Sequence, residues 1–141
     1  MTILQEPRLD TSGPCGHPLV DRLVTEFSYP HLTDTAALDG FVQAAGAHCV
    51  FLPGEVGRNL ETPDVAVVLP ELVMVFQRAF DCAVAQGPAE EAVKEAIGIH
   101  KTPSLVFFRD GKPLGAIPRV RDWDDYMARV PAILAGKGVL Q

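Results

Sequence analysis

The chain has 141 residues, which is enough for one domain with a full hydrophobic core and too few for two ordinary domains. Hydrophobic residues make up 48% of the sequence and charged residues 21%, a composition typical of globular proteins. The formal net charge of −6 argues against nonspecific binding to nucleic acid. It would suit a basic partner, although a charge of this size also serves solubility alone.

The start of the sequence and its cysteines bear on location. The first residues lack the positively charged region and apolar stretch of a secretory signal, and no run of about 18 apolar residues could span a membrane. The three Cys residues are an odd number and lie far apart, which argues against a disulfide framework. These features predict a cytoplasmic protein.

Pro and Gly residues are frequent at the start of the chain, so we expect residues 1–18 to form an N-terminal tail and residues 19–141 a single domain. Apolar spacing and capping residues predict the elements. In chain order they are a helix from 17 to 24, a weak strand from 27 to 32, a helix that follows caps at 33–35 and ends at Gly46, a strand from 48 to 52, a loop from 53 to 64, a long helix from 64 to 80 interrupted by Pro70, a strand from 80 to 85, a helix from 89 to 97, strands from 104 to 108 and 113 to 117, and a helix from 122 to 134. This alternation predicts an α/β sheet with helices on both faces.

The segment at 97–111 is the most informative part of the sequence. Residues 105–108 are apolar without a break, as in a strand buried on both faces. Pro103 suits the start of a strand, and Asp110-Gly111 is a strong hairpin signal. The order of helix, Thr-Pro, buried strand, Asp-Gly and second strand resembles the C-terminal half of a thioredoxin fold, rather than an ordinary hairpin. That resemblance implies a central mixed sheet of four or five strands flanked by helices, with a cis bond between Thr102 and Pro103.

Thioredoxins carry Cys-x-x-Cys at the start of a long helix, five residues before a helix Pro. Counting back from Pro70 places that motif at 62–65, where the sequence holds no sulfur. We therefore expect a thioredoxin-like fold lacking the Cys-x-x-Cys motif. Because thiol–disulfide exchange needs a thiolate at this position, we expect no enzyme activity and no cofactor. Thr62, Pro63 and Asp64 are equally well explained as the N-cap region of the helix.

The cysteines lie elsewhere. Cys49 and Cys82 fall within apolar strand candidates, where a free Cys behaves as a small hydrophobe. We expect Cys15 to be an exposed thiol without a role and no metal to be bound, because Cys15 and His17 alone cannot complete a zinc site, which needs four ligands. We expect Trp123 to anchor the last helix in the core.

Four segments carry a more specific resemblance: residues 51–54, 64–72, 102–111 and the turn at 121–123. Together with the missing cysteines, they resemble the hydrogenase-1 operon protein HyaE and its HupG relatives, the hydrogenase expression/formation proteins. The resemblance implies a noncatalytic maturation chaperone for the small subunit of an uptake nickel–iron hydrogenase. The chaperone would hold that precursor, with its twin-arginine signal peptide, in the cytoplasm before export. Other hydrogenase accessory proteins are further expected partners.

A twin-arginine signal peptide has a positive region followed by an apolar stretch, so its receptor needs carboxylates beside an apolar groove. The segment at 54–71 carries four carboxylates, and Arg58 is its only basic residue. We therefore expect the precursor to dock there, with the Pro103 loop as the opposite wall, although the same charges would also suit a solvated rim. The expected partner-binding residues are Glu55, Glu61, Thr62, Pro63, Asp64, Glu71, Thr102 and Pro103.

Two other functions stay open at this point. A thioredoxin-like thiol oxidoreductase would have to use a non-standard Cys, either Cys15 or Cys82, although no two cysteines are spaced for exchange. A structural module would pair through the edge of its sheet, as a homodimer. The sequence discriminates against the first alternative and not against the second.

Overall fold

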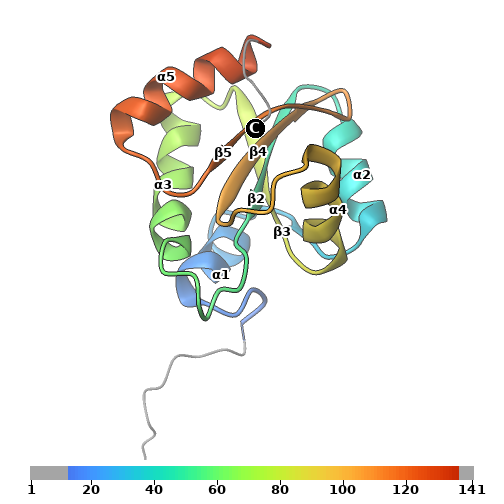
Figure 1. The fold of residues 1–141 in the computed structure, drawn as a ribbon, viewed down its shortest axis with the longest axis vertical. Helices are drawn as coiled ribbons and strands as arrows, with labels where there is room; N and C mark the ends of the chain where they lie inside the picture. The colour runs from blue at the N-terminus through green and yellow to red at the C-terminus, as the bar shows by residue number, and fades with distance from the viewer. Residues whose placement is uncertain (1–12, 137–141) are drawn as a thin grey trace, which may run out of the picture.

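A computed structural model describes residues 13–136, so most of the predicted tail and the last five residues lie outside the described part. Figure 1 shows a central sheet between two groups of helices, α1, α3 and α5 on one side and α2 and α4 on the other. The elements are α1 (Pro18–Thr25), β1 (His31–Leu32), α2 (Thr35–Gln43), β2 (Ala47–Leu52), α3 (Thr62–Val75), β3 (Phe80–Ala85), α4 (Pro88–Ile97), β4 (Ser104–Arg109), β5 (Lys112–Pro118) and α5 (Trp123–Leu134).

The sheet is mixed, as the sequence predicts. Its strand order is β1-β3-β2-β4-β5. The pairs β1–β3 and β2–β3 are parallel, whereas β4 runs antiparallel to both β2 and β5. The carboxyl ends of β2 and β3 therefore lie at the same edge of the sheet as the start of β4. That edge is where open α/β sheets bind their ligands.

Each central strand contributes to two cores, which explains why four consecutive residues in each of them are apolar. In β4, Leu105 and Phe107 pack in the cluster that includes residues of α1, α3 and α5. Val106 and Phe108 pack in the other cluster, with residues of α2 and α4. Since side chains alternate between the two faces of a strand, the part of a strand that is covered on both sides favours apolar residues at consecutive positions.

The predicted bounds of two elements are wrong. The strand expected over 27–32 shrinks to the two residues of β1. The helix expected over 64–80 begins at Thr62, with Pro63 in its first turn, and ends at Val75. It ends early because Gln77 and Arg78 adopt φ angles of 55° and 60°, in the left-handed region that stops a helix.

Two single-residue predictions are also wrong. Cys15 is buried, with 4% of its surface exposed, and its amide donates to Oδ1 of Asp21 at 2.6 Å. Trp123 is 42% exposed, and Tyr126 instead anchors the start of α5, because it is 1% exposed and its hydroxyl oxygen accepts from the Arg121 amide. The predicted burial of Cys49 and Cys82 is confirmed.

Between residues 13 and 136, no helix is long and apolar enough to cross a membrane. The same residues contain no group of three or more His, Cys, Asp or Glu side chains placed to hold a metal ion.

Candidate functional site

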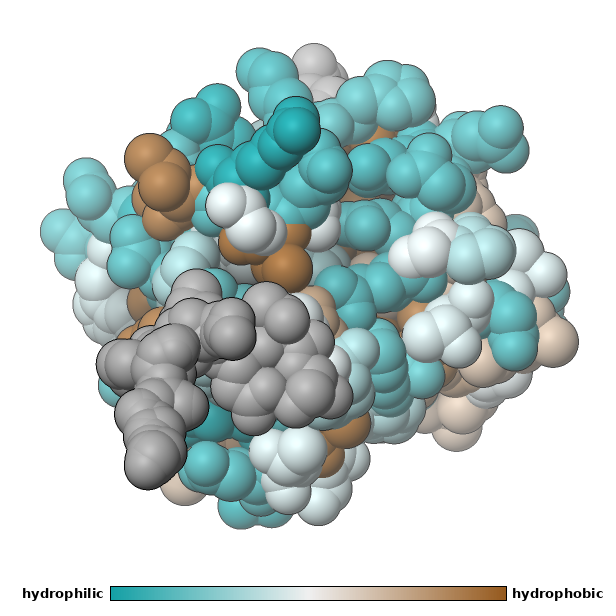
Figure 2. Space-filling view, turned by 90° about the horizontal axis from the view of Figure 1, so that it is seen from below, coloured by the Kyte–Doolittle hydropathy of each residue, from teal (hydrophilic) through white to brown (hydrophobic). Residues whose placement is uncertain are grey.

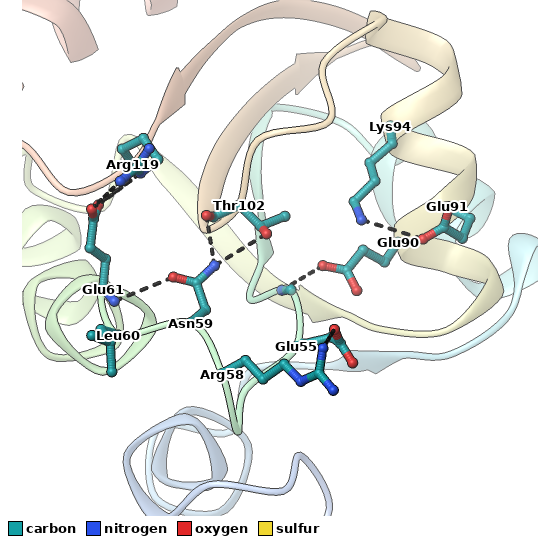
Figure 3. Close-up of a pocket in the computed structure, with 11 residues that line it drawn as sticks. Glu55, Arg58, Asn59, Leu60, Glu61, Glu90, Glu91, Lys94, Thr102 and Arg119 are labelled. Atoms are coloured by element: carbon teal, nitrogen blue, oxygen red, sulfur yellow. Dashed lines mark hydrogen bonds and ion pairs between the residues drawn. The ribbon is translucent and has the colours of Figure 1, made fainter.

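A cleft of about 670 Å³ opens at the sheet edge where β2 ends and β4 begins. The loop between β2 and α3, one side of α4, the residue before Pro103 and the residue after β5 form its walls (Figure 3). Figure 2 looks onto the lower end of the molecule as drawn in Figure 1, and hydrophilic residues cover most of that face. We call this the polar cleft; it is lined by Gly54, Glu55, Arg58, Asn59, Leu60, Glu61, Glu90, Glu91, Lys94, Thr102 and Arg119.

Asn59 connects the loop between β2 and α3 to the segment before β4 through two hydrogen bonds. Its Nδ2 donates to the carbonyl oxygen of Thr102 at 2.6 Å and to Oγ1 of the same residue at 3.2 Å. The bond from Thr102 to Pro103 is cis. Gly54 lies against the same threonine, with a φ of +73°, and an added Cβ would be 2.3 Å from its Oγ1. Only a glycine fits this close approach.

Glu61 closes one side of the polar cleft through Arg119. Its two carboxylate oxygens accept from the guanidinium, and one of them also accepts from the Val120 amide at 2.8 Å. The hydrogen bonds from Arg119 and then Val120 hold the pKa of Glu61 below its usual range. Arg119 thus neutralises Glu61 from a part of the chain 58 positions away.

The predicted partner-binding residues do not form one surface. Of the eight, Glu55, Glu61 and Thr102 line the polar cleft. Thr62 and Pro103 are buried. The Thr62 hydroxyl donates to the carbonyl oxygen of Pro53 at 2.6 Å, which gives it a structural role at the start of α3. Pro63 is half-buried and Asp64 is exposed on the first turn of α3.

Glu71 lies on a second surface, a shallow apolar groove of about 540 Å³. Met74, Val75 and Trp123 are each more than 40% exposed there, which is unusual for such large apolar side chains. We call this the α3–α5 groove; it is lined by Phe27, Pro70, Glu71, Met74, Val75 and Trp123.

Sequence reasoning missed several cleft residues, among them Asn59, Glu90 and Arg119. They lie in three separate segments of the chain, and only the fold brings them together. Glu90 had a weak signal, because the spacing places this carboxylate on the same helix face as the apolar residues Val93 and Ile97. The sequence contains no signal for the pairing of Arg119 with Glu61, which are 58 positions apart.

No cysteine reaches the position that a thioredoxin-like thiol site would occupy. Thr62 and Val65 fill the ends of that position and are buried. Burial, followed by the nearby Asp21 carboxylate, raises the pKa of Cys15 to about 12. Burial and the neighbouring Cys82 raise the pKa of Cys49 as well. Fold and site together define a thioredoxin-like protein with a charged cleft next to the position of a thiol site.

Solved structures agree with this class. A thioredoxin from Plasmodium falciparum superimposes with a TM-score of 0.58 at 13% identity, over 70% of this chain and 93% of that one. The structure described as the hydrogenase expression/formation protein hupG from Rhodopseudomonas palustris is 34% identical, with a TM-score of 0.52, over 75% of this chain and 96% of that one. The thioredoxin-like fold predicted from residues 97–111 is thereby confirmed.

Sequence comparisons identify the family. The family model described as hydrogenase-1 expression protein HyaE matches residues 19–126. The hydrogenase expression/formation protein HupG of Rhodobacter capsulatus is 56% identical over 131 residues, which cover 92% of this chain and 95% of the relative. The corresponding HoxO of Azotobacter vinelandii is 41% identical, over 86% of this chain and 80% of the relative. The chain belongs to the HyaE family of hydrogenase expression proteins, and its role lies in hydrogenase maturation.

Proposed function

We propose that this protein is a noncatalytic chaperone that binds the small-subunit precursor of a nickel–iron hydrogenase through its twin-arginine signal peptide. The observation that carries the proposal is the exposed face of α3, which begins beside a charged cleft and ends in an apolar groove. A signal peptide has the matching order of features, a positive region followed by an apolar stretch. Binding before export requires that the complex form in the cytoplasm.

The exposed face of α3 alternates acidic and apolar side chains. Asp64, Val67, Glu71 and Met74 follow one another at intervals of three and four residues, so they share one face of the helix. All four are exposed. A peptide lying along this face would meet carboxylates and apolar surface in turn, and the α3–α5 groove would take its apolar stretch.

Electrostatics favours a basic partner on this side of the molecule. The polar cleft holds four carboxylates against three basic side chains, and Asp64 and Glu71 add two more carboxylates along α3. Each exposed charge pair is worth only about 0.2–1 kcal/mol, so we expect affinity to arise from several pairs together. Complementary charge also steers a basic peptide toward the surface before it docks.

The test is capture of the precursor from hydrogenase-expressing cells by the tagged full chain. We expect the wild type to retain the small-subunit precursor and to lose it when the signal peptide is deleted. The double variant Asp64→Lys/Glu71→Lys should retain several-fold less precursor, because two attractive contacts become repulsive.

The matched control is Asp39→Lys/Glu95→Lys, which makes the same change in net charge on exposed residues of α2 and α4. This control should retain precursor as well as the wild type does. Equal retention of the full-length and signal-deleted precursors by the wild type would contradict the proposal, as would equal losses in the two double variants.

A further inference from the structure

One carboxylate of the polar cleft is buried. Glu90 lies in the first turn of α4 and is only 7% exposed. Of the other cleft carboxylates, Glu55 and Glu91 are exposed and Glu61 is half-buried. Its Oε2 accepts from the Gly54 amide at 2.7 Å. Figure 3 shows the side chain extending from α4 toward the loop between β2 and α3, on the cleft side of the helix.

Glu90 is also the one cleft carboxylate with no ion pair among the described residues. The three basic side chains of the cleft each pair with another carboxylate: Arg58 with Glu55 at 3.8 Å, Lys94 with Glu91 at 3.4 Å, and Arg119 with Glu61 at 2.5 Å. Within the same residues, Oε1 of Glu90 has no hydrogen-bond partner.

A buried carboxylate without a cation is costly in an isolated chain, because removal from water disfavours the charged form. Burial accordingly raises the pKa of Glu90, against the lowering effects of the Gly54 hydrogen bond and of Lys94. A cation brought in from outside would remove this cost, and the open volume in front of Glu90 leaves room for one.

We infer that Glu90 is the anchor for an arginine side chain of the bound partner, inserted into the polar cleft. A guanidinium suits a largely buried carboxylate better than an ammonium does, because it is more weakly hydrated and carries five donors in a plane. The free Oε1 of Glu90 would accept from it while Oε2 keeps its bond to Gly54. This inference rests on the proposed function for the identity of the partner, and the anchor itself does not require a hydrogenase.

The direct test uses a small probe, the tripeptide acetyl-Ala-Arg-Ala-amide, titrated into the isotope-labelled full chain and followed by NMR. The Gly54 amide donates to Glu90 and therefore reports on that carboxylate. We expect its signal to shift progressively with the arginine probe and to stay unchanged with the probe that carries citrulline, the neutral analogue of arginine. Glu90→Gln should abolish the shift at concentrations that saturate the wild type.

The variant Glu90→Gln keeps the shape of the side chain and an oxygen that can accept from Gly54, so the fold is expected to persist. Glu95→Gln, an exposed residue of the same helix outside the cleft, is the matched control and should behave as the wild type. With the full precursor, Glu90→Gln should raise the dissociation constant about tenfold or more, because a buried charge pair is lost.

The two proposals fail in different ways. Unchanged probe and precursor affinity in Glu90→Gln, or a Gly54 shift with the citrulline probe, would overturn the anchor and leave precursor binding in place. A Gly54 shift with the arginine probe in a chain that captures no precursor would overturn the proposed function and leave the anchor in place.

Discussion

Cys15 shows how burial decides what a thiol can do. With a pKa of about 12, its sulfur is almost entirely protonated near neutral pH, and the thiolate is the reactive form. We predict that a disulfide reagent at pH 8 labels none of the three cysteines of the native chain within minutes and labels all three after unfolding in guanidinium. The same chain should fail to reduce insulin with dithiothreitol as electron source.

A variant with an exposed thiol on α2, Ala36→Cys, provides the positive control for labelling. Rapid labelling of one native thiol that disappears in Cys15→Ser or Cys82→Ser would restore the oxidoreductase alternative.

The pairing of Glu61 with Arg119 gives the fold a specific pH dependence. The folded-state pKa of Glu61 lies below its unfolded value of about 4.3. The resulting stabilisation is therefore fully present above that value and is lost as pH falls through the folded-state pKa. We predict that Glu61→Gln lowers the midpoint of thermal unfolding at pH 7 and that the difference from the wild type vanishes at acidic pH.

Thermal melts over a pH series check this prediction. Glu55→Gln is the control, since Glu55 is exposed and its nearest approach to Arg58 is 3.8 Å, so its difference from the wild type should be small at every pH. A constant difference between Glu61→Gln and the wild type down to pH 3 would show that packing, and not ionisation, explains the effect.

At the scale of elements, the loop between β2 and α3 depends on two close contacts with Thr102. Gly54→Ala should destabilise the fold by about 1–3 kcal/mol, because the added methyl meets Thr102 and the backbone conformation disfavours any side chain. Gly57→Ala, in the same loop but with open space around it, should change the free energy of unfolding much less. Urea unfolding of both variants measures the difference; equal effects would mean that the loop is not held at Gly54.

The elements that could be predicted are those whose signals are local. The strand at Phe80–Ala85 has the predicted bounds, and the hairpin of β4 and β5 follows from an apolar run and an Asp-Gly turn. The end of α3 could not be predicted, because the left-handed residues after Val75 are Gln and Arg, which give no turn signal. β1 is shorter than predicted because only His31 and Leu32 pair with β3, at Val84 and Ala85.

The candidate site could be predicted less well than the fold, because it is assembled across the sequence. Glu55 and Glu61 were identifiable from the charge of one loop. The hydrogen-bond partners of this loop were not identifiable from the sequence, because they come from distant segments. Arg119, just after β5, reaches Glu61, and Glu90 of α4 reaches Gly54. Charge counted along a segment therefore overestimates the acidity of the surface that the segment forms.

At the scale of the whole molecule, the arrangement of the helical layers gives the proposed partner surface a direction. The polar cleft lies at the sheet edge where β2 ends and β4 begins, and α3 leads from it to the α3–α5 groove. A helix of 14 residues is about 21 Å long, so the two sites lie within reach of one extended peptide. The opposite layer, α2 and α4, contributes to this surface only through α4.

This arrangement predicts that the affinity of the protein for the precursor peptide depends on salt concentration. Glu55, Asp64 and Glu71 are exposed along the path from cleft to groove, and their joint replacement by Lys leaves the bond from Arg119 to Glu61 intact. We expect the triple variant to bind a labelled precursor peptide about tenfold or more weakly than the wild type at low salt, which corresponds to about 1.4 kcal/mol. The difference in affinity between the triple variant and the wild type should narrow as the salt concentration rises, because screening shortens the reach of surface charges. Titration at several salt concentrations measures both effects, and unchanged affinity at low salt would move the binding site to another face of the fold.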